Sequence, residues 1–387
     1  MEPERLDELL RGPAPGEAAA RERARVRVAE EFAQRRPSSR RPRGRVVVAL
    51  AAAAVALVAA LSPPGDAVAD WVRTAVGLRP HTPAGGMPTA GEQLPAAGRL
   101  LVSSGGTSWI VEASGKRRRL GAWPGASWSP HGRFAVVWRD RRLAAVDRRG
   151  NVRWSLLTPR PVTNALWAPS GFRVAYRSGQ DLRVVAGDGT GDRLLDPGTF
   201  RAMAWRPGAA HVLAYLSGAH IDIVDVDSRR RLARIRLPHV PHELAWSADG
   251  SRVYVNLHRS LAIYDARGRR TGRIWMPGRQ TISTFAPARG GTLVAVARRA
   301  ASGRSSEVAL MGPGARSRVL FAADGPFTRL RFSPSGRWLL VAWPLADQWV
   351  FLRPGATGAR RVLAAPGVTR RIGSRGFPQL SGWCCPP

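Results

Sequence analysis

The amino-acid sequence predicts an all-β protein, a β-propeller of seven four-stranded blades. An aromatic turn motif, W-x-P-x-G, recurs along the chain, and each interval between copies holds several short apolar runs. Successive copies are spaced by 39, 38, 41, 39 and 47 residues. A period of about 40 residues with an aromatic turn signature is typical of a radial array of β-sheets. The copies begin at Trp128, Trp167, Trp205, Trp246, Phe285 and Phe332.

The interval after Trp128 shows how one unit is built. A Ser-Pro-His-Gly run supplies the turn, because Pro130 fixes φ and Gly132 can adopt a positive φ. Short apolar runs separated by polar turns are typical of β-strands, and four of them make one propeller blade. In this interval they lie at 133–138, 143–147, 152–157 and 164–167.

The two ends of the array complement each other. Residues 99–120 contain three strand-like runs without a preceding anchor, whereas 377–386 contain one strand with an anchor, Trp383, and no following blade. Pairing the C-terminal strand with the N-terminal strands would close the ring and remove exposed sheet edges. Six complete units and one composite blade give seven. Six or eight blades are alternatives, because the long interval after Phe285 could hold an irregular unit.

The W-S-P-x-G turn, followed later by a strand such as IVDVDSRR at 223–230, resembles the TolB-like and WD-repeat-like β-propeller family. The resemblance covers about residues 98–387 and implies the propeller fold. TolB also carries an N-terminal α/β domain that has no counterpart in this sequence, so its role in envelope import is not carried over. The structural anchors, which we expect to pack between blades and not to contact a ligand, are Trp128, Trp167, Trp205, Trp246, Phe285, Phe332 and Trp383.

Three segments precede the predicted propeller at 98–387. Residues 1–45, rich in Ala and Arg, predict a partly helical cytoplasmic tail, with a docking helix for a partner as an alternative. Residues 46–63 predict one transmembrane helix, because Val46–Leu61 is an unbroken apolar run. Such a run is short for a span, about 24 Å as a helix, so flanking residues must help. Residues 64–97, dense in Pro, Gly and Ala, predict a linker.

The arginines around the apolar run predict the orientation. Six arginines lie between Arg35 and Arg45, whereas the first basic residue after the run is Arg73. By the positive-inside rule the tail is cytoplasmic, and the propeller lies outside the cytoplasm of a single-pass membrane protein. The alternative is a signal peptide cleaved near Ala69, which would release the propeller as a secreted protein. Both interpretations place the propeller outside the cytoplasm.

The net charge of +33 comes almost wholly from arginine, since Lys116 is the only lysine. A GC-rich genome would by itself favour arginine codons. A functional interpretation is that a basic rim attracts anionic partners. The predicted partners are therefore the membrane, through one span, and a protein or an anionic envelope polymer on the propeller face. Nucleic acid is not expected, because the propeller is predicted outside the cytoplasm and no nucleic-acid-binding motif is present.

The sequence shows no catalytic, cofactor-binding or metal-binding constellation. The close pair His239 and His242 is interrupted by Pro241 and has no nearby cysteine. Asp225 and Asp227 are more typical of turns than of a calcium loop. No G-x-S-x-G, P-loop or Rossmann motif occurs. We therefore expect no enzymatic activity and no cofactor.

The two cysteines, Cys384 and Cys385, are adjacent in the predicted closing strand. Neighbouring side chains on a strand point to opposite faces, and adjacent Cα atoms lie about 3.8 Å apart, below the usual disulfide range. This pattern favours one thiol packed inward and one outward. A vicinal disulfide in a strained turn, or an intermolecular or metal-binding role, are alternatives.

These features predict a non-enzymatic, extracytoplasmic binding or scaffolding module anchored to a bacterial membrane. Its ligand would bind where turns from all blades converge around a central channel. One alternative is a transmembrane regulator resembling an anti-sigma factor, with the propeller as sensor. Another is a lyase or hydrolase acting in the channel. Clustered carboxylates or histidines in the channel would favour the enzyme, whereas an apolar or purely Arg-lined channel would argue against it.

Overall fold

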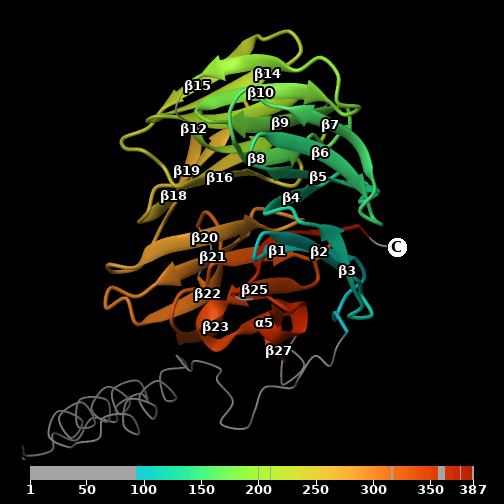
Figure 1. Cartoon of the computed structure of the whole chain (residues 1–387). Coiled ribbons are helices and arrows are strands. Elements are labelled where there is room, and N and C mark those ends of the chain that lie inside the picture. Colours follow the sequence, from blue (N-terminus) through green and yellow to red (C-terminus); the bar gives the residue numbers. More distant parts are fainter. Residues whose placement is uncertain are drawn as a thin grey trace, which may run out of the picture. The chain divides into compact units, whose positions relative to one another are not determined.

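A computed structural model describes residues 93–385, except positions 199, 210, 315–316, 356–361 and 375. The predicted tail, the predicted span at 46–63 and most of the predicted linker lie outside the described residues. Within the described part, no helix is long and apolar enough to cross a membrane. The described part contains seven four-stranded antiparallel sheets, which confirms the predicted seven-bladed propeller (Figure 1).

Each blade is a meander numbered here in ring order, with its innermost strand first. Blade 1 contains β28 (Gln379–Cys384), β1 (Arg99–Ser104), β2 (Thr107–Val111) and β3 (Arg117–Gly121). Blade 2 contains β4 (Gly125–Trp128), β5 (Phe134–Arg139), β6 (Arg142–Asp147) and β7 (Val152–Leu157). Blade 3 contains β8 (Val162–Trp167), β9 (Arg173–Ser178), β10 (Asp181–Ala186) and β11 (Arg193–Pro197). Blade 4 contains β12 (Phe200–Trp205), β13 (Val212–Ser217), β14 (His220–Asp225) and β15 (Arg231–Arg236).

The remaining three blades follow the same order. Blade 5 contains β16 (Glu243–Trp246), β17 (Arg252–Asn256), β18 (Ser260–Asp265) and β19 (Arg270–Trp275). Blade 6 contains β20 (Thr281–Pro287), β21 (Val294–Arg299), β22 (Ser305–Met311) and β23 (Arg318–Asp324). Blade 7 contains β24 (Arg329–Phe332), β25 (Leu339–Trp343), β26 (Gln348–Leu352) and β27 (Val362–Pro366).

The ring closes as predicted, through the C-terminal strand. Strand β28 pairs antiparallel with β1, and Trp383 lies opposite Leu100. The described part of the long interval after Phe285 holds no additional blade, because β20, β21, β22 and β23 form one four-stranded sheet. Strands β22 and β23 each extend over seven residues. Blade 1 thus joins the two ends of the propeller in one sheet, which leaves no gap between blades 7 and 2.

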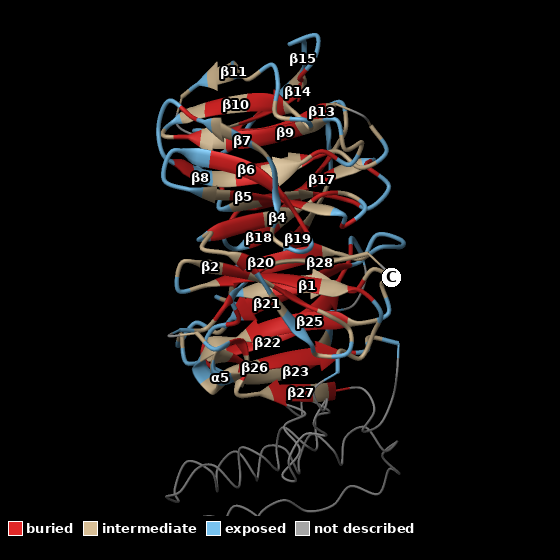
Figure 2. Cartoon of the chain, turned by 45° about the vertical axis from the view of Figure 1, so that its right-hand side comes forward, coloured by how far each residue is buried: buried red, intermediate tan, exposed pale blue. Residues whose placement is uncertain are grey.

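The middle strands explain the continuous apolar runs in the sequence. Strands such as β5, β13 and β21 lie between adjacent blades and are buried on both faces (Figure 2). The outermost strands, such as β7 and β15, carry mostly exposed or half-buried residues because solvent reaches one face. This gradient from interior to rim places the hydrophobic core between the blades.

Two short helical elements, which the sequence did not predict, lie in and after blade 7. The turn η1 (Pro344–Ala346) precedes β26, and α5 (Val368–Ile372) connects β27 to β28. The Oδ1 atom of Asp347 accepts hydrogen bonds from the backbone N of Thr369 at 2.8 Å and from its Oγ1 at 2.6 Å. These contacts fix α5 at the closure of the ring.

The meander gives the propeller two different faces. In an antiparallel meander, the turns after the first and third strands lie at one end, and the second turn and the exit lie at the other. We call the first end the anchor face, because it carries the W-x-P-x-G turns. A hydrogen bond of 2.8 Å from Arg206 Nε to Gly250 O links two such turns of blades 4 and 5. We call the second end the crossover face, because the connections between blades lie there.

Candidate functional site: the central channel and the crossover face

The predicted anchors lie between blades. Each of the seven belongs to, or packs against, a hydrophobic cluster that combines residues of two consecutive blades. The indole Nε1 of Trp205 donates to Leu166 O at 3.0 Å, and that of Trp246 donates to Ala204 O at 3.1 Å, each in the preceding blade. None of the seven, all of which the structure describes, lines the central cavity. The anchors therefore join neighbouring blades and do not form the channel wall.

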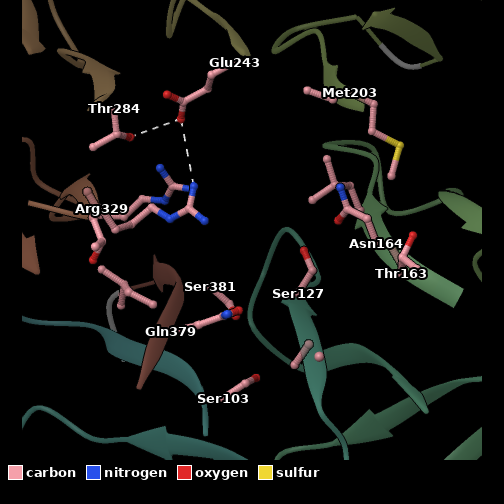
Figure 3. Close-up of a pocket in the computed structure, with 18 of the residues that line it drawn as sticks. Ser103, Ser127, Thr163, Asn164, Met203, Glu243, Thr284, Arg329, Gln379 and Ser381 are labelled. Atoms are coloured by element: carbon pink, nitrogen blue, oxygen red, sulfur yellow. Dashed lines mark hydrogen bonds and ion pairs between the residues drawn. The ribbon is translucent and has the colours of Figure 1, made fainter. Parts of the chain in front are cut away.

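The centre of the ring holds a cavity of about 620 Å³, to which all seven blades contribute lining residues. Most of its polar groups are hydroxyls and amides. Figure 3 shows Glu243, Thr284 and Arg329 on one side of this cavity, opposite Met203 and Asn164. The uncharged polar lining residues are Ser103, Ser127, Thr163, Asn164, Ser283, Thr284, Thr328, Gln379 and Ser381.

The charged groups of the cavity come from two blades, 5 and 7, with blade 6 between them. Glu243 begins β16, and Arg329 and Arg331 lie on β24, where alternation along the strand puts both on one side. The Glu243 carboxylate accepts hydrogen bonds from Thr284 Oγ1 at 3.2 Å and from the backbone N of Phe285 at 3.3 Å, both in β20. Its Oε1 lies 3.9 Å from the Nη1 of Arg329.

Burial acts on both signs of charge in the cavity. It raises the pKa of Glu243 above its usual value, although Arg331, Arg329 and the two hydrogen bonds from β20 lower it. Burial together with the neighbouring Arg329 lowers the pKa of Arg331 to about 10, opposed by Glu243. The Glu243 side chain as a whole is 22% exposed. Arg331 stays cationic at neutral pH, so the arginines outnumber the carboxylate two to one.

A second cavity of about 480 Å³ adjoins the channel on the crossover face of blade 5. His242 lines both cavities, and His239, His258 and Trp275 line the second. The rings of His242 and His258 have centroids 5.6 Å apart. Trp275 is 63% exposed, and the guanidinium of Arg273 lies 4.8 Å from its ring centroid. The structure thus gathers an exposed indole, histidines and an arginine beside the channel.

The described residues contain no group of three or more His, Cys, Asp or Glu side chains placed to hold a metal ion. The imidazole of His239 instead lies 3.2 Å, through Nε2, from Leu257 O. Asp225 closes a turn, because its Oδ1 accepts hydrogen bonds from the backbone N of Asp227 and Ser228, each at 3.0 Å.

The two cysteines are joined in a vicinal disulfide, instead of the free thiols that strand alternation favours. The reason is local, because β28 ends at Cys384 and Cys385 adopts a positive φ of 48°, which turns the chain out of the strand. Both sulfurs lie against the anchor-face turn of blade 2. A Cβ atom at Gly132 would be only 3.0 Å from the Cys385 sulfur, and Gly132 has a φ of 60°, so both the contact and the backbone favour glycine there.

No protein-family model matches the chain, and no curated protein matches its sequence. Among solved structures it is similar to Kuenenia stuttgartiensis hydrazine synthase, with a TM-score of 0.53 and 15% identity over 64% of this chain and 88% of that chain. It is also similar to a chain of the mitotic checkpoint complex, with a TM-score of 0.50 and 14% identity over 62% of this chain and 76% of that chain. The chain is a β-propeller. At these identities the likeness shows the fold alone.

A third solved structure, the β-propeller domain of Myceliophteria thermophila Cps50 (Swd1), is similar with a TM-score of 0.49 and 14% identity. The match covers 62% of this chain and 85% of the Cps50 (Swd1) chain.

Sequence reasoning missed the charged residues of the channel. A signal was present, because Glu243 and Arg329 each stand three positions before an anchor, and Arg331 stands one before. The equivalent positions in the other inner strands hold uncharged residues. Superposing the repeats on their anchors would therefore have singled out these three side chains.

Proposed function

We propose that the protein is a non-enzymatic binding or scaffolding module of the bacterial envelope, with a TolB-like propeller held outside the cytoplasm by the predicted span at 46–63. The observation that carries the binding role is that the channel and the cavity beside it lie on either side of one shared lining residue, His242. Binding sites are typically concave surfaces with a few convergent polar groups. The crossover face offers such a surface.

The residues of the second cavity support recognition of a protein. Tryptophan and arginine are the residues that most often dominate protein–protein binding energy, and on this face Trp275 and Arg273 lie in contact. An exposed indole costs little conformational entropy to fix on binding. Trp275 is therefore the residue that we expect to anchor a partner.

The charges of the channel favour binding over catalysis. Within the described residues that line it, Glu243 is the only carboxylate and His242 the only histidine, whereas two arginines are present. Such a wall suits an anionic group of a partner.

A matched pair of variants tests the binding role. Trp275 is 63% exposed on the crossover face, and Phe172 is 65% exposed in an anchor-face turn. Immobilised full-length wild type and the variants Trp275→Ala and Phe172→Ala are incubated with solubilised envelope proteins, and retained species are quantified. We expect Trp275→Ala to lose a species that wild type and Phe172→Ala retain. Equal retention by all three would contradict the proposal.

The proposed topology has its own test. The test uses cells whose outer envelope layers have been removed but whose cytoplasmic membrane is unbroken. Added protease should digest the propeller while the tail at 1–45 stays protected. Fractionation should find the full-length chain in the membrane. Digestion of the propeller only after lysis would overturn the exterior location, and a soluble propeller starting near Ala69 would favour the cleaved signal.

A further inference from the structure

The guanidinium of Arg331 has unused hydrogen-bonding capacity inside the channel. A guanidinium carries five N–H donors. The Nη1 of Arg331 donates to Leu330 O at 3.0 Å, and no other acceptor of the described residues contacts the group. Since the side chain lines the cavity, its remaining donors are available to whatever occupies the channel.

Glu243 does not neutralise both arginines. Its carboxylate is held by Thr284 and Phe285 of β20 and approaches Arg329 only to 3.9 Å. One carboxylate against two guanidinium groups leaves an excess of one positive charge in the cavity wall. A second anion between Arg329 and Arg331 would balance this charge and make charge-assisted hydrogen bonds.

The rest of the cavity indicates what kind of anion fits. Away from the charged residues, the rest of the wall presents hydroxyl and amide groups, among them Ser127, Asn164 and Gln379 (Figure 3). Such groups both donate and accept hydrogen bonds, which suits a ligand rich in hydroxyls. A cavity of about 620 Å³ has room for a sugar-sized molecule.

We propose that the channel binds a hydroxylated carboxylate of the sugar-acid class, with its carboxylate held between Arg329 and Arg331. Glu243 acts as an internal counter-ion that competes with the ligand for Arg329. This inference rests on the proposed binding role of the crossover face and names the chemistry recognised at its centre. A free sugar acid and the acidic end residue of an envelope polysaccharide share that chemistry.

Titration calorimetry of the full-length protein in detergent tests the site. The probes are glucuronate, an oligosaccharide ending in glucuronate, and glucose as the neutral analogue. We expect wild type to bind glucuronate and not glucose. Tighter binding of the oligosaccharide would identify a polymer end as the source, and equal affinity would identify the free sugar acid. Absence of glucuronate and oligosaccharide binding, or equal binding of glucose, would overturn the proposal.

Two substitutions in the cavity should change the affinity for glucuronate in opposite directions. Arg331→Gln should weaken glucuronate binding at least tenfold, whereas Glu243→Gln should strengthen it roughly tenfold, because a competing negative charge a few ångströms away is removed. Arg279→Gln removes an exposed arginine of the same face outside the cavity and should change nothing. Weakening by Glu243→Gln would contradict the counter-ion role.

Two readouts keep the outcomes separable. Thermal unfolding identifies a variant that fails to fold, and Arg331→Lys, which keeps the positive charge, should then retain part of the binding. Failure of glucuronate binding with Trp275-dependent retention intact overturns this inference alone. If Trp275→Ala retains the same envelope species as wild type, the proposed function itself is overturned.

Discussion

At the scale of single residues, aspartates close the turns between the third and fourth strands of several blades. In blade 2, Asp147 Oδ1 accepts hydrogen bonds from the backbone N of Arg149 at 2.8 Å and of Asn151 at 3.0 Å. In blade 5, Asp265 Oδ1 likewise accepts hydrogen bonds from the backbone N of Arg267 and of Arg269. The carboxylate replaces water as the partner of the turn N–H groups, which is why the sequence places an acidic residue at these strand ends.

Replacing Asp147 by Asn should make stability depend differently on pH. Burial opposes ionisation of Asp147, but hydrogen bonds from Asn151, Arg149 and Arg153 lower its pKa to about 2. A depressed pKa means that the ionised form stabilises the fold above the ordinary value of 3.8, and that this contribution is lost as the pH falls to about 2. Asp147→Asn should therefore cost about 1 kcal/mol at pH 7.

The measurement is thermal unfolding of wild type and Asp147→Asn across this range. The difference in Tm should be constant from pH 7 to about pH 5 and shrink below the ordinary pKa of an aspartate. A difference that does not change with pH would show that ionisation of Asp147 does not stabilise the turn.

At the scale of elements, each interface between blades is organised around one aromatic anchor. Phe285 packs among residues such as Leu261 of blade 5 and Val294 of blade 6, and it is 1% exposed. Phe332 packs against the cluster between blades 6 and 7 but is only half-buried. The same motif position thus contributes different amounts of buried apolar surface in different blades.

Truncating these two anchors should have unequal effects. Phe285→Ala should lower the free energy of unfolding by about 3–5 kcal/mol, because a fully enclosed cavity replaces the ring. Phe332→Ala should cost clearly less, since solvent can fill part of the space. Denaturant unfolding of both variants measures the difference, and an equal cost would show that burial of the anchor does not determine its contribution.

The elements also show what sequence reasoning could and could not find. Blade strands were predictable because each consists of a local apolar run between turn residues. Helix α5 was not, because five residues form a helix only with tertiary support, here from Asp347 and from burial of Val368 and Ile372. Glu243 and Arg331 line one cavity only because β16 and β24 are both inner strands of the ring. Their large separation along the chain therefore does not indicate that they belong to the same site.

At the scale of the whole molecule, the ring depends on a pairing between chain segments that are far apart. Strand β28 is the innermost strand of blade 1 and pairs with β1, nearly the full length of the propeller away in sequence. This pairing was predictable because an anchor without a blade and a blade without an anchor stand at opposite ends. Ring closure also completes the channel wall, since Gln379 and Ser381 line the cavity.

Removing the closing strand should destabilise the entire propeller. Deletion of 377–387 exposes the edge of β1 and breaks the cluster around Trp383, so we expect a large fall in Tm and aggregation. Deletion of 386–387 alone, after the end of β28, should leave Tm unchanged. Unaltered thermal unfolding after the longer deletion would mean that closure contributes little.

Photo-crosslinking in living cells tests most directly whether the crossover face is the binding surface. A photo-reactive amino acid is placed at position 275 on that face or, as the control, at position 172 on the anchor face, two sites of nearly equal exposure. Illumination should give a discrete crosslinked adduct from position 275 and none from position 172. Adducts from position 172 alone, or from neither position, would contradict the proposal that the propeller binds its partner through the crossover face.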